Sequence, residues 1–186
     1  MRLFVAIDLD EGARQAIGAE QQRLAKALGA DRSPTWVQPT RMHVTLAFLG
    51  DIGDAKAREV IDAMSPDLDV SPFAAVFDRF GVFPARGRPR VLWLGVGEGA
   101  REMAEVQRRV TDRLDRLDVA LEPRPFHPHL TLARWRTSRP VDGQRALSAG
   151  RHADVARVIV DHVTLYHSRL TSAGSTYTAL SRATLT

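Results

Sequence analysis

Apolar and polar positions along the chain alternate in short blocks that predict strands and helices following one another. Residues 3–9 form an apolar run ended by acidic residues, which is typical of a buried strand. Residues 101–117 carry apolar side chains at steps of three and four, as on one face of a helix. The pattern predicts strands over residues 3–9, 43–49, 73–83, 90–96, 130–133, 155–165 and 176–180. It predicts helices over residues 11–28, 55–64, 101–117 and 141–147.

The order of these elements favours an α+β fold. Strands that alternate with helices are compatible with a parallel sheet, but residues 73–83 and 90–96 flank the turn sequence PARGRPR and predict a hairpin. The helices are also irregularly spaced, which favours α+β over regular βαβ units. No linker or low-complexity tract divides the chain. We therefore expect one domain over residues 1–186, built from two small lobes.

Composition excludes several classes of function. The chain has no cysteine, which rules out disulfides, a thiolate zinc site and a cysteine nucleophile. No apolar stretch approaches the 18 residues of a membrane span, and the apolar run at the N-terminus is too short for a signal peptide. We expect a monomer in the cytoplasm, without a membrane partner.

The chain is basic, and its cations are almost all arginine. Its net charge is +4 with a pI near 10.3. Of 26 lysines and arginines, only Lys26 and Lys56 are lysine. Arginine pairs bidentately with phosphate, but arginine enrichment also accompanies GC-rich coding sequence. The charge therefore permits a polyanionic substrate without arguing for one.

A repeat is the most specific feature of the sequence. The segment PTRMHVTLA (residues 39–47) is echoed by PFHPHLTLA (residues 125–133), with proline, histidine, threonine, leucine and alanine at the same offsets. The two copies are 86 positions apart, close to half of the chain length. Chance predicts about 0.04 occurrences of His-x-Thr-Leu in a chain of this composition. The repeat therefore indicates two copies of one structural unit.

Strand alternation explains what this motif can do. Side chains two apart on a strand share a face, so a histidine and a threonine project together while their apolar neighbours anchor the strand. Two such units related by a pseudo-twofold axis would bring two imidazoles and two hydroxyls to one groove. Two imidazoles can act as acid and base on a phosphate, and hydroxyls can hold its oxygens. The motif residues are His43, Val44, Thr45 and Leu46, and His129, Leu130, Thr131 and Leu132.

A third copy of the pattern, His162-Val-Thr-Leu, lies off this period. It lacks the preceding proline and the following alanine, and it begins only 33 residues after His129. We interpret it as a coincidental match on a strand, with side chains that face solvent or a sheet edge.

Two rival sites are weaker. Gly95, Gly97 and Ala100 form a G-x-G-x-x-A turn, and Glu122 could hold a ribose as in a dinucleotide fold, but no further βαβ units follow. His43, His127 and His129 could bind a metal, yet no carboxylate or cysteine accompanies them. We therefore expect no cofactor and no metal.

The chain resembles the two-histidine (2H) phosphoesterases, most closely the RNA 2',3'-cyclic phosphodiesterase branch, formerly called 2'-5' RNA ligases. The resemblance covers RLFVAIDL, WVQPTRMHVTLAFLGDI, GVFPARGRPRVLWLGV, FHPHLTLAR and VTLYHSRLTSAGSTYTAL. It implies two pseudosymmetric lobes, each an antiparallel sheet with outer helices, and a groove between them. By this resemblance His43 is the proton donor and His129 is the proton acceptor. The hydroxyls on the same strand faces make Thr45 and Thr131 the expected phosphate-binding groups.

The implied activity is metal-independent hydrolysis of 2',3'-cyclic phosphate ends of RNA, or of small cyclic nucleotides, to a 2'-phosphate and a 3'-hydroxyl. Ligation of 2'-5' ends at the same groove is an alternative, because each step is reversible in kind. A module that binds RNA ends without turnover is another alternative, although binding alone would not need both imidazoles.

The sequence leaves the roles of several residues near the motifs open. Alternation points Arg134 away from His129, unless a bulge or a strand end returns it to the site. The turn with Arg86, Arg88 and Arg90 could follow an RNA backbone or could be a solvated hairpin tip. Five aromatic residues could stack on a base or belong to the core: Trp36, Phe48, Trp93, Phe126 and Trp135.

Overall fold

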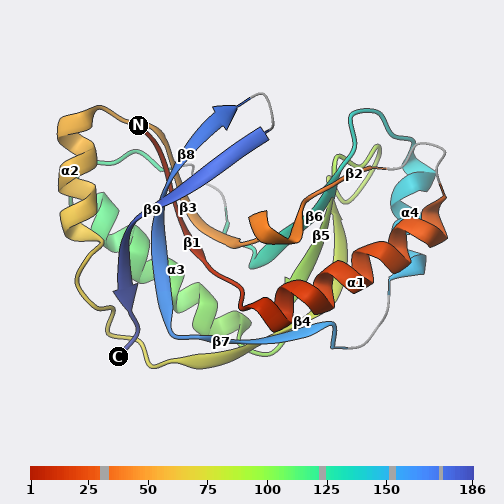
Figure 1. Ribbon diagram of the computed structural model, residues 1–186, viewed down its shortest axis with the longest axis horizontal. Coiled ribbons are helices and arrows are strands. Elements are labelled where there is room, and N and C mark those ends of the chain that lie inside the picture. Colours follow the sequence, from red (N-terminus) through yellow and green to blue (C-terminus); the bar gives the residue numbers. More distant parts are fainter. Residues whose placement is uncertain (30–33, 122–124, 151–153, 172–173) are drawn as a thin grey trace.

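The computed structural model describes residues 1–29, 34–121, 125–150, 154–171 and 174–186 (Figure 1). Its strands are β1 (Arg2–Ile7), β2 (Thr35–Trp36), β3 (Val44–Asp51), β4 (Phe73–Phe83), β5 (Val91–Val96), β6 (His129–Arg134), β7 (Ala156–Val160), β8 (His162–Thr171) and β9 (Gly174–Thr184). Its helices are α1 (Glu11–Leu28), α2 (Asp54–Ala63), α3 (Ala100–Asp115) and α4 (Pro140–Ala149), with a 3₁₀ turn η1 (Pro39–Arg41). Among these described residues, no helix is long and apolar enough to cross a membrane.

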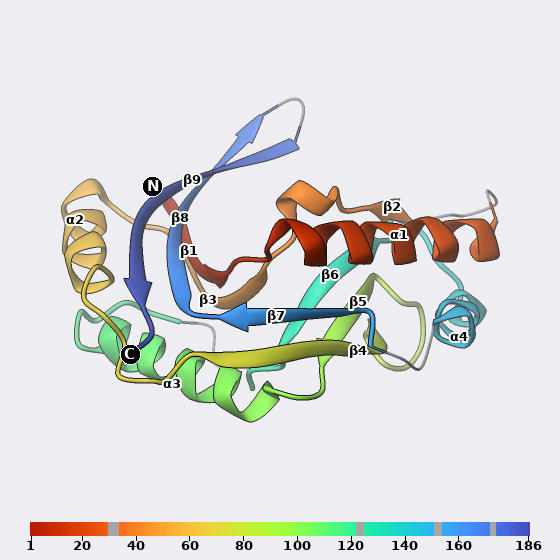
Figure 2. The ribbon, with the colours of Figure 1, turned by 60° about the horizontal axis from the view of Figure 1, so that its bottom comes forward.

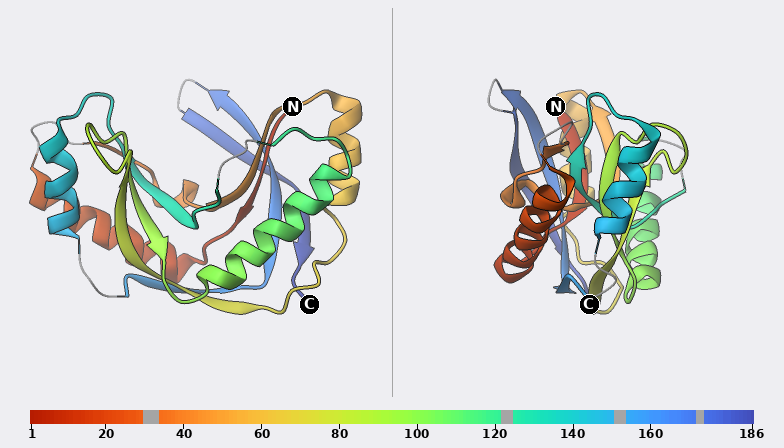
Figure 3. Two further views of the ribbon diagram at one scale, coloured as in Figure 1. Left: turned by 180° about the vertical axis from the view of Figure 1, so that it is seen from behind. Right: turned by 90° about the vertical axis from the view of Figure 1, so that its right-hand side faces the viewer.

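The strands form one antiparallel sheet that curls into two lobes. The order is β7-β4-β5-β6-β3-β1-β8-β9, and β2 pairs with β6. One lobe contains β3, β1, β8 and β9, and the other contains β6, β5, β4 and β7. The lobes meet where β3 pairs with β6 through Val44 and Leu130. The view from behind shows them as two arms that diverge from this junction (Figure 3). The expectation of a two-lobed α+β fold is confirmed.

The lobes are interleaved along the chain. Helix α1 follows β1 of the first lobe but packs against β7 and α4 of the second lobe. Helix α3 follows β5 of the second lobe but packs against β3 of the first lobe as well as β4. Figure 2 shows α1 and α3 on separate sides of the molecule, with β4 and β7 side by side. Each lobe therefore needs sequence from both halves of the chain.

Local sequence explains where the helices begin and end. Asp10 caps α1 by accepting a hydrogen bond from the Ala13 amide at 2.7 Å, and Gly29 ends the helix with φ of 72°. Helix α3 buries an apolar stripe made of Met103, Val106, Val110 and Leu114. These helices lie within two residues of their predicted bounds.

Two predictions about the strands are wrong. Residues 155–165 were expected to form one strand, but the strand breaks at Asp161 because β7 pairs with β4 while β8 pairs with β1 and β9. The chain passes from one lobe to the other at this point, which a run of β-branched residues does not reveal. Residues 35–36, where the pattern predicts no strand, form the short strand β2.

The expected exposure of the third His-Val-Thr-Leu copy is also wrong. Strand β8 lies between β1 and β9, so it is not a sheet edge. Thr164 is 0% exposed and donates a hydrogen bond to the Asp8 carboxylate at 2.8 Å. His162 is only partly exposed. The polar side chains of this copy therefore take part in the packing around Asp8.

One glycine allows an aromatic ring to pack against the sheet. Gly81 on β4 pairs with Trp93 on β5, and the Trp93 ring occupies the space where a Cβ on residue 81 would lie. We expect Gly81→Ala to lower the free energy of unfolding by about 1–3 kcal/mol, because the ring must move within a packed sheet. Urea unfolding measures this change. Gly12→Ala on the exposed start of α1 is the matched control, and we expect it to raise stability by about 0.5 kcal/mol. Equal effects of the two substitutions would contradict the packing argument.

Candidate active site

The two motif histidines are held in the same way. Nδ1 of His43 lies 3.0 Å from the carbonyl oxygen of Arg41, and Nδ1 of His129 lies 2.6 Å from the carbonyl oxygen of His127. A carbonyl can only accept, so Nδ1 carries a proton in each ring and donates it to the backbone two residues earlier. Nε2 is then the nitrogen that can accept or donate a catalytic proton. The repeat in the sequence thus corresponds to a repeat in side-chain orientation.

The sheet register relates the histidines to the threonines. Val44 pairs with Leu130 between antiparallel strands, and both side chains are buried. Extending this register by one residue in each direction sets His43 opposite Thr131 and Thr45 opposite His129. The local twofold axis therefore passes through the Val44–Leu130 pair, with one imidazole and one hydroxyl of each motif on the other face of the strands.

Aromatic rings surround both imidazoles. The His43 ring stacks on Phe4 at 4.8 Å between centroids and meets the edge of Tyr177 at 5.3 Å. The His129 ring meets Phe83 edge-on at 5.1 Å and Trp93 at 6.0 Å. These contacts fix the rings and remove water from them. Burial is the main cause that lowers the pKa of both histidines below its ordinary value, against the opposing effect of each Nδ1 hydrogen bond.

The charged groups that shift the pKa of the two rings have opposite signs. After burial and the backbone hydrogen bond, the Asp8 carboxylate acts on the pKa of His43 and raises it. His127 and the positive charge of Arg134 act on the pKa of His129 and lower it further. Asp8 therefore favours the protonated form of His43 and Arg134 favours the neutral form of His129, while burial favours the neutral form of both rings.

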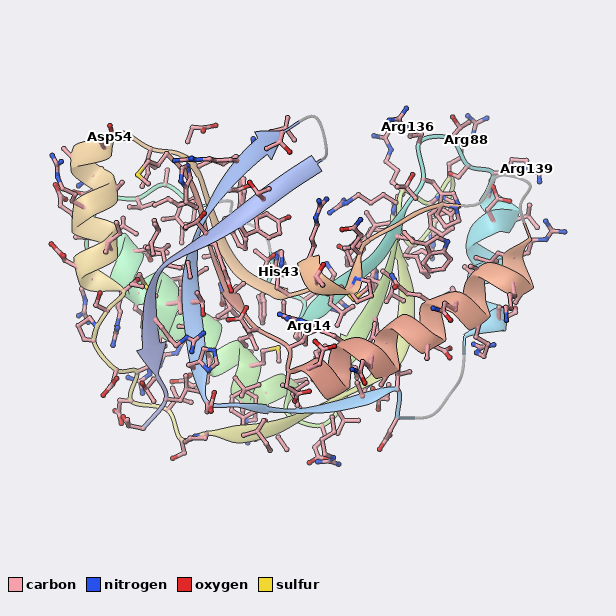
Figure 4. The ribbon with its side chains drawn as sticks, in the orientation of Figure 1. Arg14, His43, Asp54, Arg88, Arg136 and Arg139 are labelled. Atoms are coloured by element: carbon pink, nitrogen blue, oxygen red, sulfur yellow. The ribbon has the colours of Figure 1, made fainter. Side chains whose placement is uncertain are left out.

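Two hollows lie beside the motif strands. The larger, of about 750 Å³, is lined by Thr45 and Phe48 from β3 and by His129, Thr131 and Arg134 from β6. His43 is not in its lining. It faces a second hollow of about 330 Å³, together with Asp8, Arg14, Tyr166 and Tyr177. In Figure 4, His43 and Arg14 lie near each other between the lobes. The structure brings three of the four predicted motif side chains into one cavity and sets His43 in another hollow.

A bulge returns Arg134 to the cavity. Thr131 pairs with Trp93 and Ala133 pairs with Leu92, so Leu132 is an extra residue that changes the phase of β6. The Leu132 carbonyl accepts hydrogen bonds from the Val37 amide and from Gln21 Nε2, each at 2.9 Å. Arg134 is exposed, lines the cavity with His129, and forms no ion pair within the described ranges. Because of the bulge, Arg134 lies on the same side of β6 as His129 and not on the opposite face that regular alternation predicts.

The other motif strand has the equivalent bulge. Val5 pairs with Ala47 and Ala6 pairs with Thr45, so Leu46 is the extra residue in β3. This bulge brings Phe48, which is 39% exposed, into the lining of the larger cavity. Of the other aromatic candidates for base stacking, Phe126 lines the same cavity, Trp135 is buried, and Trp36 and Trp93 are partly buried.

The structure does not support the rival dinucleotide site. Strand β5 is antiparallel to both of its neighbours, so no βαβ unit is present at this turn. The space beside Gly97, where a phosphate would approach, is occupied by the Asp78 carboxylate. Glu122 lies outside the described residues.

The predicted alternative of a metal at His43, His127 and His129 also lacks support. Within the described ranges, no group of three or more His, Cys, Asp or Glu side chains is placed to hold a metal ion. The His127 and His129 rings are 6.0 Å apart, and both pack against Trp93.

Several residues of the site carry no motif in the sequence. Asp8 accepts hydrogen bonds from Thr164 and from the Tyr166 hydroxyl, at 2.8 and 2.7 Å, and His162 Nε2 lies 3.4 Å from it. Burial and the bond to Asp8 raise the pKa of Tyr166 to about 12. An acidic residue at the end of an apolar strand was the available signal for Asp8. Gln21 was signalled by its polar side chain on the buried stripe of α1.

Two lobes that present paired His-x-Thr strands define the class of the two-histidine phosphoesterases. Residues 20–171 match the model of the 2'-5' RNA ligase superfamily. The chain belongs to the 2'-5' RNA ligase superfamily.

Curated relatives and solved structures agree with this family. The chain is 34% identical over 180 residues to an RNA 2',3'-cyclic phosphodiesterase of Methanothermobacter thermautotrophicus, covering 96% of this chain and 95% of the relative. It is 32% identical to the Aquifex aeolicus protein of the same name, covering 89% of each. The crystal structure of Escherichia coli LigT complexed with 3'-AMP has a TM-score of 0.78 and 26% identity, covering 100% of this chain and 98% of LigT. The crystal structure of TT0787 from Thermus thermophilus also has a TM-score of 0.78 and 26% identity, covering 99% of this chain and 97% of TT0787.

The lowered histidine pKa values predict how stability depends on pH. An unfolded histidine titrates near 6.5, whereas folded His43 and His129 titrate lower, so the unfolded state binds more protons as the pH falls. Their contribution to stability is complete above about pH 7 and is lost as the pH falls through 6.5 toward the folded values. We expect His43→Gln combined with His129→Gln to flatten the free energy of unfolding between pH 8 and 5, measured by urea titration. An unchanged slope in this variant would contradict the prediction.

Proposed function

We propose that this protein hydrolyses the 2',3'-cyclic phosphate ends of RNA, leaving a 2'-phosphate and a 3'-hydroxyl. The family, the relatives named RNA 2',3'-cyclic phosphodiesterase and the paired His-x-Thr strands support the proposal. We also propose that the protein acts as a monomer in the cytoplasm and that residues 1–186 form one functional unit. The proposed catalysis needs neither a metal nor a cofactor.

One observation carries the assignment of roles. Two imidazoles are held alike through Nδ1, yet Asp8 faces His43 while Arg134 and His127 face His129. A nearby carboxylate favours a protonated imidazole, and nearby cations favour a neutral one. This difference supports His43 as the proton donor and His129 as the proton acceptor, although the repeat alone leaves the two equivalent.

The proposed reaction has one displacement at phosphorus. Nε2 of neutral His129 takes a proton from water while the water oxygen forms a bond to phosphorus. The bond from phosphorus to the 3' oxygen breaks, and protonated His43 gives its Nε2 proton to that oxygen. The product keeps the phosphate on the 2' oxygen. General acid–base catalysis of this kind contributes about 10²–10⁴ to the rate.

Three further polar side chains would stabilise the negative charge that develops on the phosphate oxygens during the reaction. Thr45 and Thr131 would donate hydrogen bonds to the non-bridging phosphate oxygens, because each lies opposite a histidine of the other motif. Arg134 would pair with the same oxygens from the cavity wall that it shares with His129. These three groups would stabilise the negative charge of the transition state.

Two other activities are possible at the same groove. Ligation would run the displacement with an RNA hydroxyl in place of water, using the same two histidines. A module that only binds RNA ends would not need imidazoles arranged as acid and base. The charged groups that shift the pKa of the two rings differ in sign, which favours turnover over binding alone.

The reaction can be tested directly with a short RNA that ends in a 2',3'-cyclic phosphate. We expect complete hydrolysis in the presence of EDTA, and phosphorus NMR should show only the 2'-phosphate. Addition of an RNA with a 5'-hydroxyl measures ligation in the same sample. Exclusive formation of 3'-phosphate would contradict the leaving-group assignment, and loss of turnover in EDTA would require a metal.

Substitution of the histidines tests the proposed roles. We expect His43→Ala and His129→Ala each to lower kcat by about 10²–10⁴, with the double variant little worse because the two act as a unit. His162→Ala is the matched control from the third copy of the pattern. Asp8 keeps its bonds from Thr164 and Tyr166 in that variant, so we expect its kcat to stay within about threefold. Full activity of either motif variant would overturn the mechanism.

A further inference from the structure

Five arginines lie in two chain segments that adjoin the lining of the larger cavity, and one of them, Arg134, is part of that lining. Arg86, Arg88 and Arg90 lie in the turn between β4 and β5, while Arg134 and Arg136 lie at and beyond the end of β6. We name these five residues the arginine rim. All five are exposed. Residues from two distant parts of the chain thus place a concentrated positive charge at one edge of the second lobe.

Backbone contacts hold the two segments of the rim together. Arg134 pairs with Val91 in the sheet, and the Trp135 amide donates to the Arg90 carbonyl at 2.9 Å. The Ser138 hydroxyl donates to the Pro89 carbonyl at 2.5 Å. Figure 4 shows Arg88 and Arg136 at the same edge of the second lobe. These bonds therefore hold the two segments of the rim in a fixed position relative to each other.

The charge of the rim is not neutralised by the protein. No side chain of the five forms an ion pair or hydrogen bond with any residue in the described ranges. Within the same ranges some arginines elsewhere do, although others, such as Arg58, do not: Arg108 and Arg109 pair with Glu105 at 2.7 Å, and Arg139, next to the rim, lies 3.7 Å from the Asp142 carboxylate. The guanidinium groups of the rim are free to bind an external anion.

The rim is continuous with the proposed active site. Pro84 and Val91, which flank the arginine turn, line the larger cavity together with His129 and Arg134. Arg136 is two residues beyond Arg134, so their Cα atoms are at most about 7 Å apart. An anion chain that enters the cavity would therefore meet the rim immediately outside it.

We propose that the arginine rim binds the backbone phosphates of the RNA strand that leads to the cyclic end. The inference rests on the proposed function and specifies its substrate: an oligoribonucleotide is preferred to a cyclic mononucleotide. A row of unpaired guanidinium groups matches a row of phosphates, and arginine binds phosphate bidentately. A cyclic mononucleotide has a single phosphate, which the catalytic groups and Arg134 hold, so it leaves the other four arginines of the rim unused.

The test compares two substrates and two triple variants. The rim variant is Arg86→Gln, Arg88→Gln and Arg136→Gln. We expect its kcat/KM for a decaribonucleotide with a 2',3'-cyclic end to fall about tenfold or more at low salt, with kcat/KM for 2',3'-cyclic AMP within about twofold. The dependence of log kcat/KM on log salt should become shallower by about 2, at about 0.7 for each lost phosphate contact on a single strand.

The matched control removes the same charge elsewhere. Arg58, Arg101 and Arg116 are exposed on α2, on α3 and just after α3, and none lines either hollow. We expect the triple glutamine variant at these positions to keep both activities within about twofold. A rim variant that behaves like this control would overturn the inference, because general charge would then be sufficient.

Direct binding separates the inference from the proposed function. Fluorescence anisotropy with a labelled decaribonucleotide measures affinity without turnover. Weaker binding of the rim variant than of the control supports the rim even if the wild-type protein hydrolyses neither substrate, which would overturn the proposed function instead. Equal RNA affinity of the two triple variants overturns the inference. An acidic protein surface would then be the next partner to test for the arginine rim.

Discussion

The pairing of Val44 with Leu130 is the constraint on which the site depends. Both residues are 0% exposed, and they join the two lobes at the centre of a continuous sheet. Because the two motif strands run antiparallel at this point, each histidine lies across from the threonine of the other motif. A shift of one residue would turn every motif side chain to the wrong face. Buried apolar contacts therefore decide the alignment of the polar groups.

Local symmetry and local electrostatics serve different purposes in this molecule. The two strands repeat the same backbone hydrogen bond from Nδ1, the same alternation and the same bulge at the leucine of the motif. Their surroundings differ: Asp8 directly follows β1, the strand beside β3, whereas Arg134 follows the bulge in β6. A reaction that needs one acid and one base requires such a difference between two otherwise equivalent imidazoles. The same bulges produce a second difference, since they bring Phe48 into the cavity from one side and Arg134 from the other.

Because the lobes are interleaved, residues that are far apart in the sequence make polar contacts with each other at the site. Asp8 directly follows the first strand, and its partners Thr164 and Tyr166 come from β8, near the end of the chain. Gln21 on α1 reaches the Leu132 carbonyl and supports the bulge beside His129. Each contact satisfies a buried polar group that would otherwise weaken the fold. Stability and positioning of the reactive groups are therefore coupled in this fold.

The sequence by itself determined the elements and the identity of the chemical groups. Periodicity located the helices, a single apolar run located β1, and the repeated His-x-Thr-Leu predicted two histidines and two threonines on equivalent strands, because these signals are local. Only the tertiary structure decided what depends on contacts between distant residues. The break at Asp161, the burial of Thr164, the return of Arg134 to the cavity and the approach of Asp8 to His43 all follow from strand order and bulges. No local pattern encodes these features, since the partner strands come from opposite ends of the chain.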